Sequence, residues 1–127
     1  MQKQDRKKVL AVVDDLLFTV KISDAAKRVG LDAEFLKTEQ DVLEKAKLDK
    51  PLLIILDLNA NSVQALKLIQ KIKGNGELKQ ISLIGFLSHV QGELKQQAQE
   101  AGANIVMARS AFSQNLQQIL KRHAGVP

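Results

Sequence analysis

The sequence predicts an α/β fold in which helices cover both faces of a five-stranded parallel sheet. Short apolar, β-branched runs alternate with longer segments whose apolar residues recur every three or four positions, and five such pairs fit into the 127 residues. Strands that alternate with helices pair in parallel through right-handed crossovers. Five units are too few for an eight-fold barrel. They match the doubly wound, flavodoxin-like sheet with strand order 2-1-3-4-5.

Three apolar runs are the clearest strand candidates. They are residues 9–13 (VLAVV), 52–56 (LLIIL) and 81–87 (ISLIGFL), and the weaker candidates are 33–37 and 104–107. The run LLIIL has no polar residue at alternate positions, as expected of a central strand that is covered on both faces.

Helical spacing fills the segments between these runs. The first helical stripe consists of Phe18, Ile22, Ala26 and Val29 and ends at Gly30. Residues 38–41 (TEQD) read as a capping box that opens the second helix. The remaining stripes are Val63, Leu66, Ile69 and Ile72; Leu94, Ala98 and Ala101; and Phe112, Leu116, Ile119 and Leu120.

Composition excludes several classes of function. The length fits one domain over residues 1–127, and the absence of Cys excludes disulfides, zinc–thiolate sites and a cysteine nucleophile. The polar start MQKQDRKK is no signal peptide, and no apolar run approaches the roughly 18–20 residues that span a bilayer. The net charge is +5, but the basic residues are dispersed, and Trp and Tyr are absent. We therefore expect a cytoplasmic protein that binds neither nucleic acid nor membrane.

Polar residues follow four of the predicted strands at their carboxyl ends, where open parallel sheets bind ligands. They are Asp14 and Asp15 after the first strand, Asp57 and Asn59 at the third, Ser88 after the fourth and Arg109 after the fifth. Because the first and third strands are neighbours, three carboxylates are expected to share one crevice. Such like charges repel, and a hard cation such as Mg²⁺ is one reason to keep them together. A hydroxyl and a permanent cation opposite them suit a tetrahedral anion, which indicates phosphoryl chemistry.

Single residues of this set also have simpler interpretations. Asp14 or Asp15 alone could cap the first helix, and Ser88 alone could be a turn residue. His89, beside the predicted crevice, reads as a surface residue. Residues 74–76 (GNG) read as a turn, because Asn-Gly readily adopts positive φ. They are not expected to form a phosphate loop, because no strand precedes them and no helix follows directly.

Together these motifs resemble the CheY-like receiver domains of two-component response regulators, over about residues 8–123. VVDDLLFTVKI is similar to the family's acidic-pair motif, LLIILDLN to its phosphoacceptor strand and FLSH to the segment that carries a Thr or Ser. The resemblance implies that Asp57 accepts a phosphoryl group from a histidine kinase or phosphotransfer protein. It further implies that Asp14, Asp15, Asp57 and the Asn59 carbonyl hold Mg²⁺, and that Ser88 binds the phosphoryl oxygen after switching.

Three positions depart from the pattern of this family. Arg109-Ser110 stands where the family has a Lys that is usually followed by Pro, and Val106 occupies a position that often holds a Tyr or Phe switch. Residues 60–63 (ANSV) replace the usual segment after the acceptor. Arg is a planar fork rather than a flexible point charge, so these residues indicate an altered switch.

Three hypotheses follow. The first is a stand-alone receiver in a phosphorelay, which is phosphorylated on Asp57 with Mg²⁺, signals by protein–protein contact and is not a classical enzyme. The second is a pseudo-receiver, an interaction module in which Arg109 pairs permanently with Asp57 without phosphorylation. The third, a small-molecule binder, is disfavoured because acidic residues rather than a phosphate-cradling loop follow the first strand.

By the same resemblance, a downstream protein partner would bind a polar face near the C-terminus. This face consists of Gln96, Gln97, Gln117, Gln118 and Lys121. A surface of this composition predicts a transient, wet interface.

Overall fold

The computed structural model describes residues 7–88 and 92–125, and within them five strands alternate with five helices. The elements are β1 (Lys8–Val12), α1 (Leu16–Arg28), β2 (Asp32–Phe35), α2 (Glu39–Asp49), β3 (Leu53–Asp57), α3 (Ala65–Lys73), β4 (Ser82–Leu87), α4 (Gly92–Ala101), β5 (Ile105–Ala108) and α5 (Arg109–Ala124). The strands form one parallel sheet in the order β2-β1-β3-β4-β5. The predicted fold class and strand order are confirmed.

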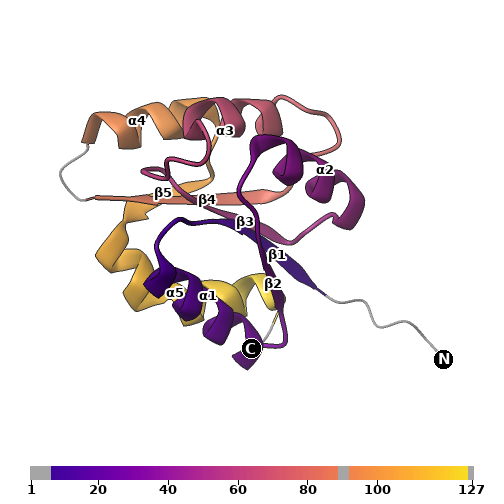
Figure 1. The fold of residues 1–127 in the computed structure, drawn as a ribbon, viewed down its shortest axis with the longest axis vertical. Coiled ribbons are helices and arrows are strands. Elements are labelled where there is room, and N and C mark those ends of the chain that lie inside the picture. The colour runs from indigo at the N-terminus through magenta and orange to yellow at the C-terminus, as the bar shows by residue number, and fades with distance from the viewer. Residues whose placement is uncertain (1–6, 89–91, 126–127) are drawn as a thin grey trace.

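The sheet lies between two layers of helices, with α2, α3 and α4 on one face and α1 and α5 on the other (Figure 1). Side chains of the central strand β3 pack against both layers of helices. Its Ile54 and Leu56 pack in the core beneath α2, α3 and α4, whereas Leu53 and Ile55 pack beneath α1 and α5. All four side chains are fully buried, and each such burial contributes about 2 kcal/mol to folding. This explains why the strand is apolar at every position before Asp57.

The predicted helix ends are largely confirmed. Helix α1 ends at the predicted place, since Val29 is its C-cap and Gly30 follows with a φ of 78°. Helix α2 begins as predicted, because Thr38 Oγ1 accepts a hydrogen bond of 3.0 Å from the backbone N–H of Asp41. None of the helices within the described ranges is long and apolar enough to cross a membrane.

One predicted helix begins later than its apolar pattern indicates. Val63 was expected in α3, but this helix starts at Ala65. The preceding residues 61–62 are bound by the carboxylate of Asp14, which accepts hydrogen bonds from Asn61 and Ser62. These bonds hold the segment as a loop, so Val63 packs against the core from outside the helix.

Candidate functional site

The buried carboxylate of Asp57 is the centre of the candidate site. It ends β3 and is 3% exposed, the single buried polar residue in the described part of the chain. Asp57 Oδ1 accepts a 2.9 Å hydrogen bond from the backbone N–H of Asn59. Burial raises the pKa of Asp57, and the nearby charges of Asp14 and Asp15 add to this rise, while Asn59 and Arg109 oppose it. Ionisation of this carboxylate is therefore less favourable than it would be in water.

The two carboxylate oxygens of Asp15 bind different groups. Its Oδ1 caps α1 by accepting hydrogen bonds from the backbone N–H groups of Leu17 (2.7 Å) and Phe18 (3.4 Å). Its Oδ2 accepts a 3.1 Å hydrogen bond from Arg109 Nη1. The simpler interpretation of this residue, a cap of the first helix, is therefore what the structure shows.

Asp14 is directed to the loop after β3. Its Oδ2 accepts a 2.7 Å hydrogen bond from the backbone N–H of Asn61, and its Oδ1 accepts a 3.0 Å bond from Ser62 Oγ. Lys37 Nζ lies 4.0 Å from the same Oδ1. The bond from Asn61 lowers the pKa of Asp14, helped by Ser62 and Lys37. This carboxylate stays ionised and fixes the loop.

Arg109 is the first residue of α5, and its guanidinium bridges two carboxylates. Besides the bond to Asp15, Nη2 lies 4.0 Å from Asp57 Oδ2. The guanidinium carbon lies 5.0 Å from the ring centroid of Phe18 and 5.8 Å from that of Phe86, within the range of cation–π attraction. The second hypothesis expected this residue against Asp57, whereas its shorter contact is with Asp15.

A stack of three aromatic rings supports the guanidinium. The ring centroids of these residues form a triangle, with distances of 5.1 Å between Phe18 and Phe86, 4.6 Å between Phe86 and Phe112 and 6.3 Å between Phe18 and Phe112. The sequence placed Phe18 and Phe112 in helical core stripes but gave no sign that they form one stack with Phe86 beside Arg109. A rigid aromatic surface limits the positions that the guanidinium can take.

The remaining predicted residues lie at or behind the same edge. Asn59 Oδ1 accepts a 3.2 Å hydrogen bond from the backbone N–H of Ser88, which links the loops after β3 and β4. Ser88 is half-buried. Val106 is buried in the core on the α2–α4 side and does not reach the surface as a switch residue would. His89 lies outside the described residues.

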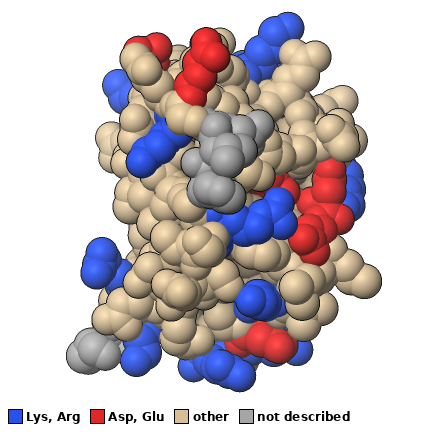
Figure 2. All heavy atoms as spheres, turned by 90° about the vertical axis from the view of Figure 1, so that its left-hand side faces the viewer, with Lys and Arg blue, Asp and Glu red and all other residues tan. Residues whose placement is uncertain are grey.

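As arranged, the three carboxylates that the resemblance assigns to Mg²⁺ have partners within the protein. Within residues 7–88 and 92–125, no group of three Asp, Glu, His or Cys side chains is placed to hold one. The carboxylates of Asp14 and Asp15 accept hydrogen bonds from the protein on both oxygens. The positive charge that bridges Asp15 and Asp57 comes from Arg109. Figure 2 views the molecule from the left-hand side of Figure 1, and acidic and basic side chains lie next to one another on this face.

Exposed apolar residues lie directly beside this edge. Leu16, Leu17 and Val20, in the first turns of α1, are 76%, 61% and 50% exposed. Sequence reasoning missed them, although a signal was present: they fall off the buried stripe of Phe18 and Ile22 on the same helix. Of the predicted partner face, Gln96, Gln97 and Gln118 are exposed, while Gln117 and Lys121 are half-buried.

Several solved structures with a similar fold are response regulators or their receiver domains. One from Hahella chejuensis has a TM-score of 0.81 and 21% identity and covers 92% of this chain and 94% of its own. A CheY-like receiver domain protein from Methanospirillum hungatei JF-1 has a TM-score of 0.78 and 18% identity, with 94% of each chain covered. The phosphorylated cyanobacterial phytochrome response regulator RcpA has a TM-score of 0.74 and 22% identity, with 92% and 90% covered.

These similarities show that the chain has the CheY-like receiver fold, as the sequence motifs implied. No protein-family model matches the chain. No curated protein matches it either.

Proposed function

We propose that this chain is a receiver-like signalling module that acts through protein–protein contacts, with its acidic crevice held in one state by Arg109 and without phosphorylation. The observation that carries the proposal is the bridge from Arg109 to Asp15 and Asp57. A guanidinium fork can bind two carboxylates at once. It supplies permanently the positive charge that a receiver of the first hypothesis would take from Mg²⁺.

Burial explains why this bridge would persist. Asp57 is almost completely buried, and an uncompensated buried charge is strongly destabilising. The Phe18 and Phe86 rings hold the guanidinium in place. An entering cation would therefore have to displace Arg109 from a position that the aromatic stack and Asp15 both favour.

The exposed residues Leu16, Leu17 and Val20 are the surface that we assign to the partner. Large side chains that stay exposed beside one another on a small protein are a common mark of an interaction site. They follow Asp15 directly, so a partner bound there would also contact the edge of the crevice. This surface is more apolar than the C-terminal polar face that the sequence indicated.

A second candidate is phosphorylation of Asp57 by a histidine kinase or phosphotransfer protein, with Mg²⁺. It is favoured by the place of Asp57 at the end of β3, near Arg109, and by Ser88, which follows the neighbouring strand β4. The fold shared with a phosphorylated response regulator also favours it. It requires Arg109 to leave Asp15 and Asp57. The two candidates therefore differ in what Arg109 does.

Treatment with acetyl phosphate and Mg²⁺, followed by intact-mass measurement, separates them. The natural chain is expected to gain no phosphoryl group over hours, and Asp57→Asn is the matched control. Arg109→Lys, which removes the fork but keeps the charge, is expected to accept one if the bridge is what blocks the site. Rapid modification of the natural chain that is lost in Asp57→Asn would establish the second candidate instead.

A further inference from the structure

Positive charge is concentrated in the helices that cover one face of the sheet. Helices α1 and α5 carry six Lys and Arg side chains against one carboxylate, that of Asp24. Helices α2, α3 and α4 on the other face carry six Lys against six Asp and Glu. The lower part of Figure 2, where α1 and α5 lie, shows mainly basic side chains. The excess in the α1–α5 layer equals the formal net charge of the whole chain, +5.

A groove runs between α1 and α5 within this layer. Its volume is about 280 Å³, and its lining includes Lys21, Asp24 and Arg28 of α1 and Ser113 and Gln117 of α5. The two helices lie side by side here (Figure 1), and Lys21 Nζ donates a 2.9 Å hydrogen bond to Ser113 Oγ between them. We call this the basic groove.

Most cations of this layer are not neutralised within the protein. Arg109 pairs with Asp15 and Asp57 at the carboxyl edge of the sheet. Among the residues that the structure describes, the other five cations of α1 and α5 form no ion pair; they are Lys21, Lys27, Arg28, Lys121 and Arg122. The basic groove and the helix ends beside it therefore carry an excess of positive charge.

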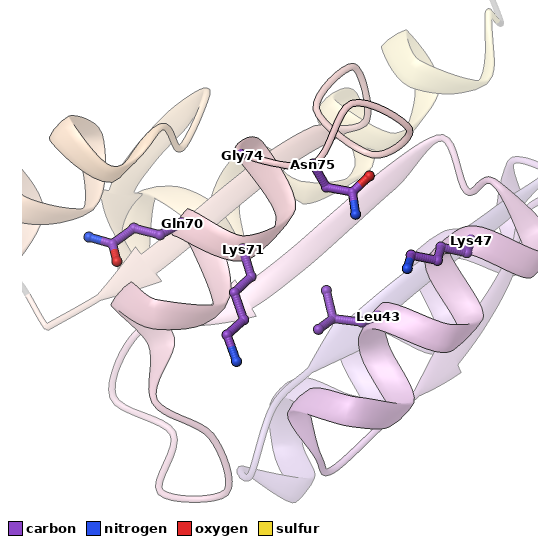
Figure 3. Close-up of a pocket in the computed structure, with 6 residues that line it drawn as sticks. All are labelled: Leu43, Lys47, Gln70, Lys71, Gly74 and Asn75. Atoms are coloured by element: carbon purple, nitrogen blue, oxygen red, sulfur yellow. The ribbon is translucent and has the colours of Figure 1, made fainter.

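A comparable groove between α2 and α3 lacks such an excess (Figure 3). It is lined by Lys47 and Lys71, but Lys71 pairs with Glu39. The α2 wall carries four carboxylates against two lysines. Charge therefore distinguishes the basic groove from this one.

Apolar side chains continue the exposed face of α1 next to the basic groove. They are Leu16, Leu17 and Val20, which we call the apolar end of α1. Leu17 and Lys21 are four residues apart, so they are neighbours on the helix surface. Helix α1 is about 20 Å long. Its exposed face thus offers an apolar half and a basic half over a length that fits another short helix.

We propose that this surface binds an amphipathic helix of a partner protein, which runs antiparallel to α1. Acidic residues in its first turns face Lys21, Arg28 and Lys121, and apolar residues in its last turns cover the apolar end of α1. Carboxylates in the first turn of a helix are favoured by the dipole of that helix, which is why we assign the antiparallel direction. The inference rests on the proposed function in one respect, that the chain acts through protein–protein contacts.

Other anionic partners match this surface less well. Nucleic acid would leave the apolar end of α1 without an apolar partner, and no aromatic ring lines the basic groove on which a base could stack. An anionic bilayer would bring its headgroups against Asp14, which is exposed beside the apolar end and stays ionised. A helix with an acidic and an apolar half is complementary to both parts.

Fluorescence anisotropy with a labelled, alanine-rich peptide at low ionic strength tests this proposal. The peptide has glutamates at every fourth position of its first half and leucines at the same spacing in its second half. Arg28→Gln should weaken its binding about fivefold, the equivalent of about 1 kcal/mol for one exposed charge pair. Leu17→Gln should weaken it about tenfold, because an apolar contact is lost. Asp24→Asn should strengthen it about threefold, because a carboxylate that repels the peptide is removed.

Lys95→Gln and Glu93→Gln are the matched controls, because they change the same charges at exposed positions on α4. Both affinities should stay within about twofold of that of the natural chain. Equal weakening by Lys95→Gln and Arg28→Gln would mean attraction by net charge alone and would overturn the proposal. A peptide with the same residues in reverse order should bind more weakly, and equal binding would contradict the antiparallel helix.

Two further results would show that the proposal is wrong. One is displacement of the peptide by a DNA duplex, or by vesicles that contain phosphatidylserine, at a lower concentration than unlabelled peptide requires. The other is absence of peptide binding to the natural chain, which would leave the proposed function untouched. Phosphorylation of the natural chain by acetyl phosphate would instead overturn that function and leave this inference standing.

Discussion

Arg109 Nη1 and Asp15 Oδ2 lie 3.1 Å apart and join residues that are 94 positions apart in the sequence. Because Asp15 is the N-cap of α1 and Arg109 opens α5, this single bond ties the starts of the two helices that cover one face of the sheet. The same guanidinium reaches Asp57 on the central strand. The guanidinium of Arg109 therefore connects α1, α5 and β3 at one point.

The cap and the ion pair of Asp15 can be separated by two substitutions. Asp15→Asn keeps an oxygen that caps α1 but removes the charge that faces Arg109, and the loss should be below about 1 kcal/mol, because the pair is partly exposed. Asp15→Ala removes both and should lower the free energy of unfolding by about 1–2 kcal/mol. Urea denaturation measures the difference. Equal losses in the two variants would show that the cap contributes nothing.

Asp57→Asn should stabilise the protein at neutral pH. Burial raises the pKa of Asp57 in the folded state above the usual value of about 3.9, so the folded chain binds this proton more tightly than the unfolded chain. The contribution of Asp57 to stability is then present below pH 3.9 and is lost as the pH rises through the folded-state pKa. Removing the charge should raise stability at pH 7 by about 1 kcal/mol, or roughly 4 °C in Tm.

The pH dependence supplies the control for this substitution. The advantage of Asp57→Asn over the natural chain should shrink as the pH falls, because a growing fraction of Asp57 is then protonated in the natural chain as well. The pKa of Asp14 is shifted downward, so its contribution has the opposite sign and is lost on acidification. A stability gain that is constant from pH 7 to pH 4 would contradict the assignment to buried charge.

Gly85→Ala tests how tightly the residue after Asp57 is held. A Cβ at Gly85 would lie 3.1 Å from side-chain atoms of Leu58, which must then shift by a few tenths of an ångström. Leu58 is buried and follows the candidate acceptor directly. We expect a loss of about 1 kcal/mol, measured by thermal unfolding. Gly76→Ala, where a Cβ meets nothing within 4 Å, is the control and should be near neutral.

The exposed apolar residues of α1 should be dispensable for folding. Leu16→Gln and Leu17→Gln change side chains that are largely in solvent, so each should alter the free energy of unfolding by less than about 0.5 kcal/mol. Ile22→Ala on the same helix removes a fully buried side chain and should cost about 2–5 kcal/mol. If the two Leu variants were as destabilised as Ile22→Ala, these residues would belong to the core rather than to a partner surface.

Sequence patterns predicted the fold because the patterns that define its strands and helices occur several times along the chain. Apolar runs and helical stripes recur five times, so an error of one residue at a strand end, as at β3, does not alter the topology. The strand ends also placed Asp14, Asp15 and Asp57 at one edge. What each carboxylate binds could not be predicted, because the choice depends on distances between groups far apart in the chain. The carboxylate of Asp14 accepts hydrogen bonds from residues 61–62, and that of Asp15 accepts one from Arg109. No local sequence pattern encodes these contacts.

The last prediction concerns competition between Arg109 and Mg²⁺ for the same carboxylates. In the natural chain the guanidinium compensates Asp15 and Asp57, so millimolar Mg²⁺ should leave the Tm unchanged. Arg109→Ala removes two ion pairs and the packing on Phe18 and Phe86, and should lower stability by about 1–2 kcal/mol.

The same substitution removes the guanidinium from Asp15 and Asp57, and Mg²⁺ is usually bound by one or two carboxylates together with waters. A cation that binds only the folded state stabilises it by about 1.4 kcal/mol at ten times its Kd. Mg²⁺ should therefore restore much of the Tm that Arg109→Ala loses, and the double variant with Asp57→Asn should respond less. The free energy regained measures the competition between guanidinium and metal for the same carboxylates. If Mg²⁺ instead raises the Tm of the natural chain as much as that of Arg109→Ala, the guanidinium does not compete with the metal, and the idea that Arg109 takes its place is wrong.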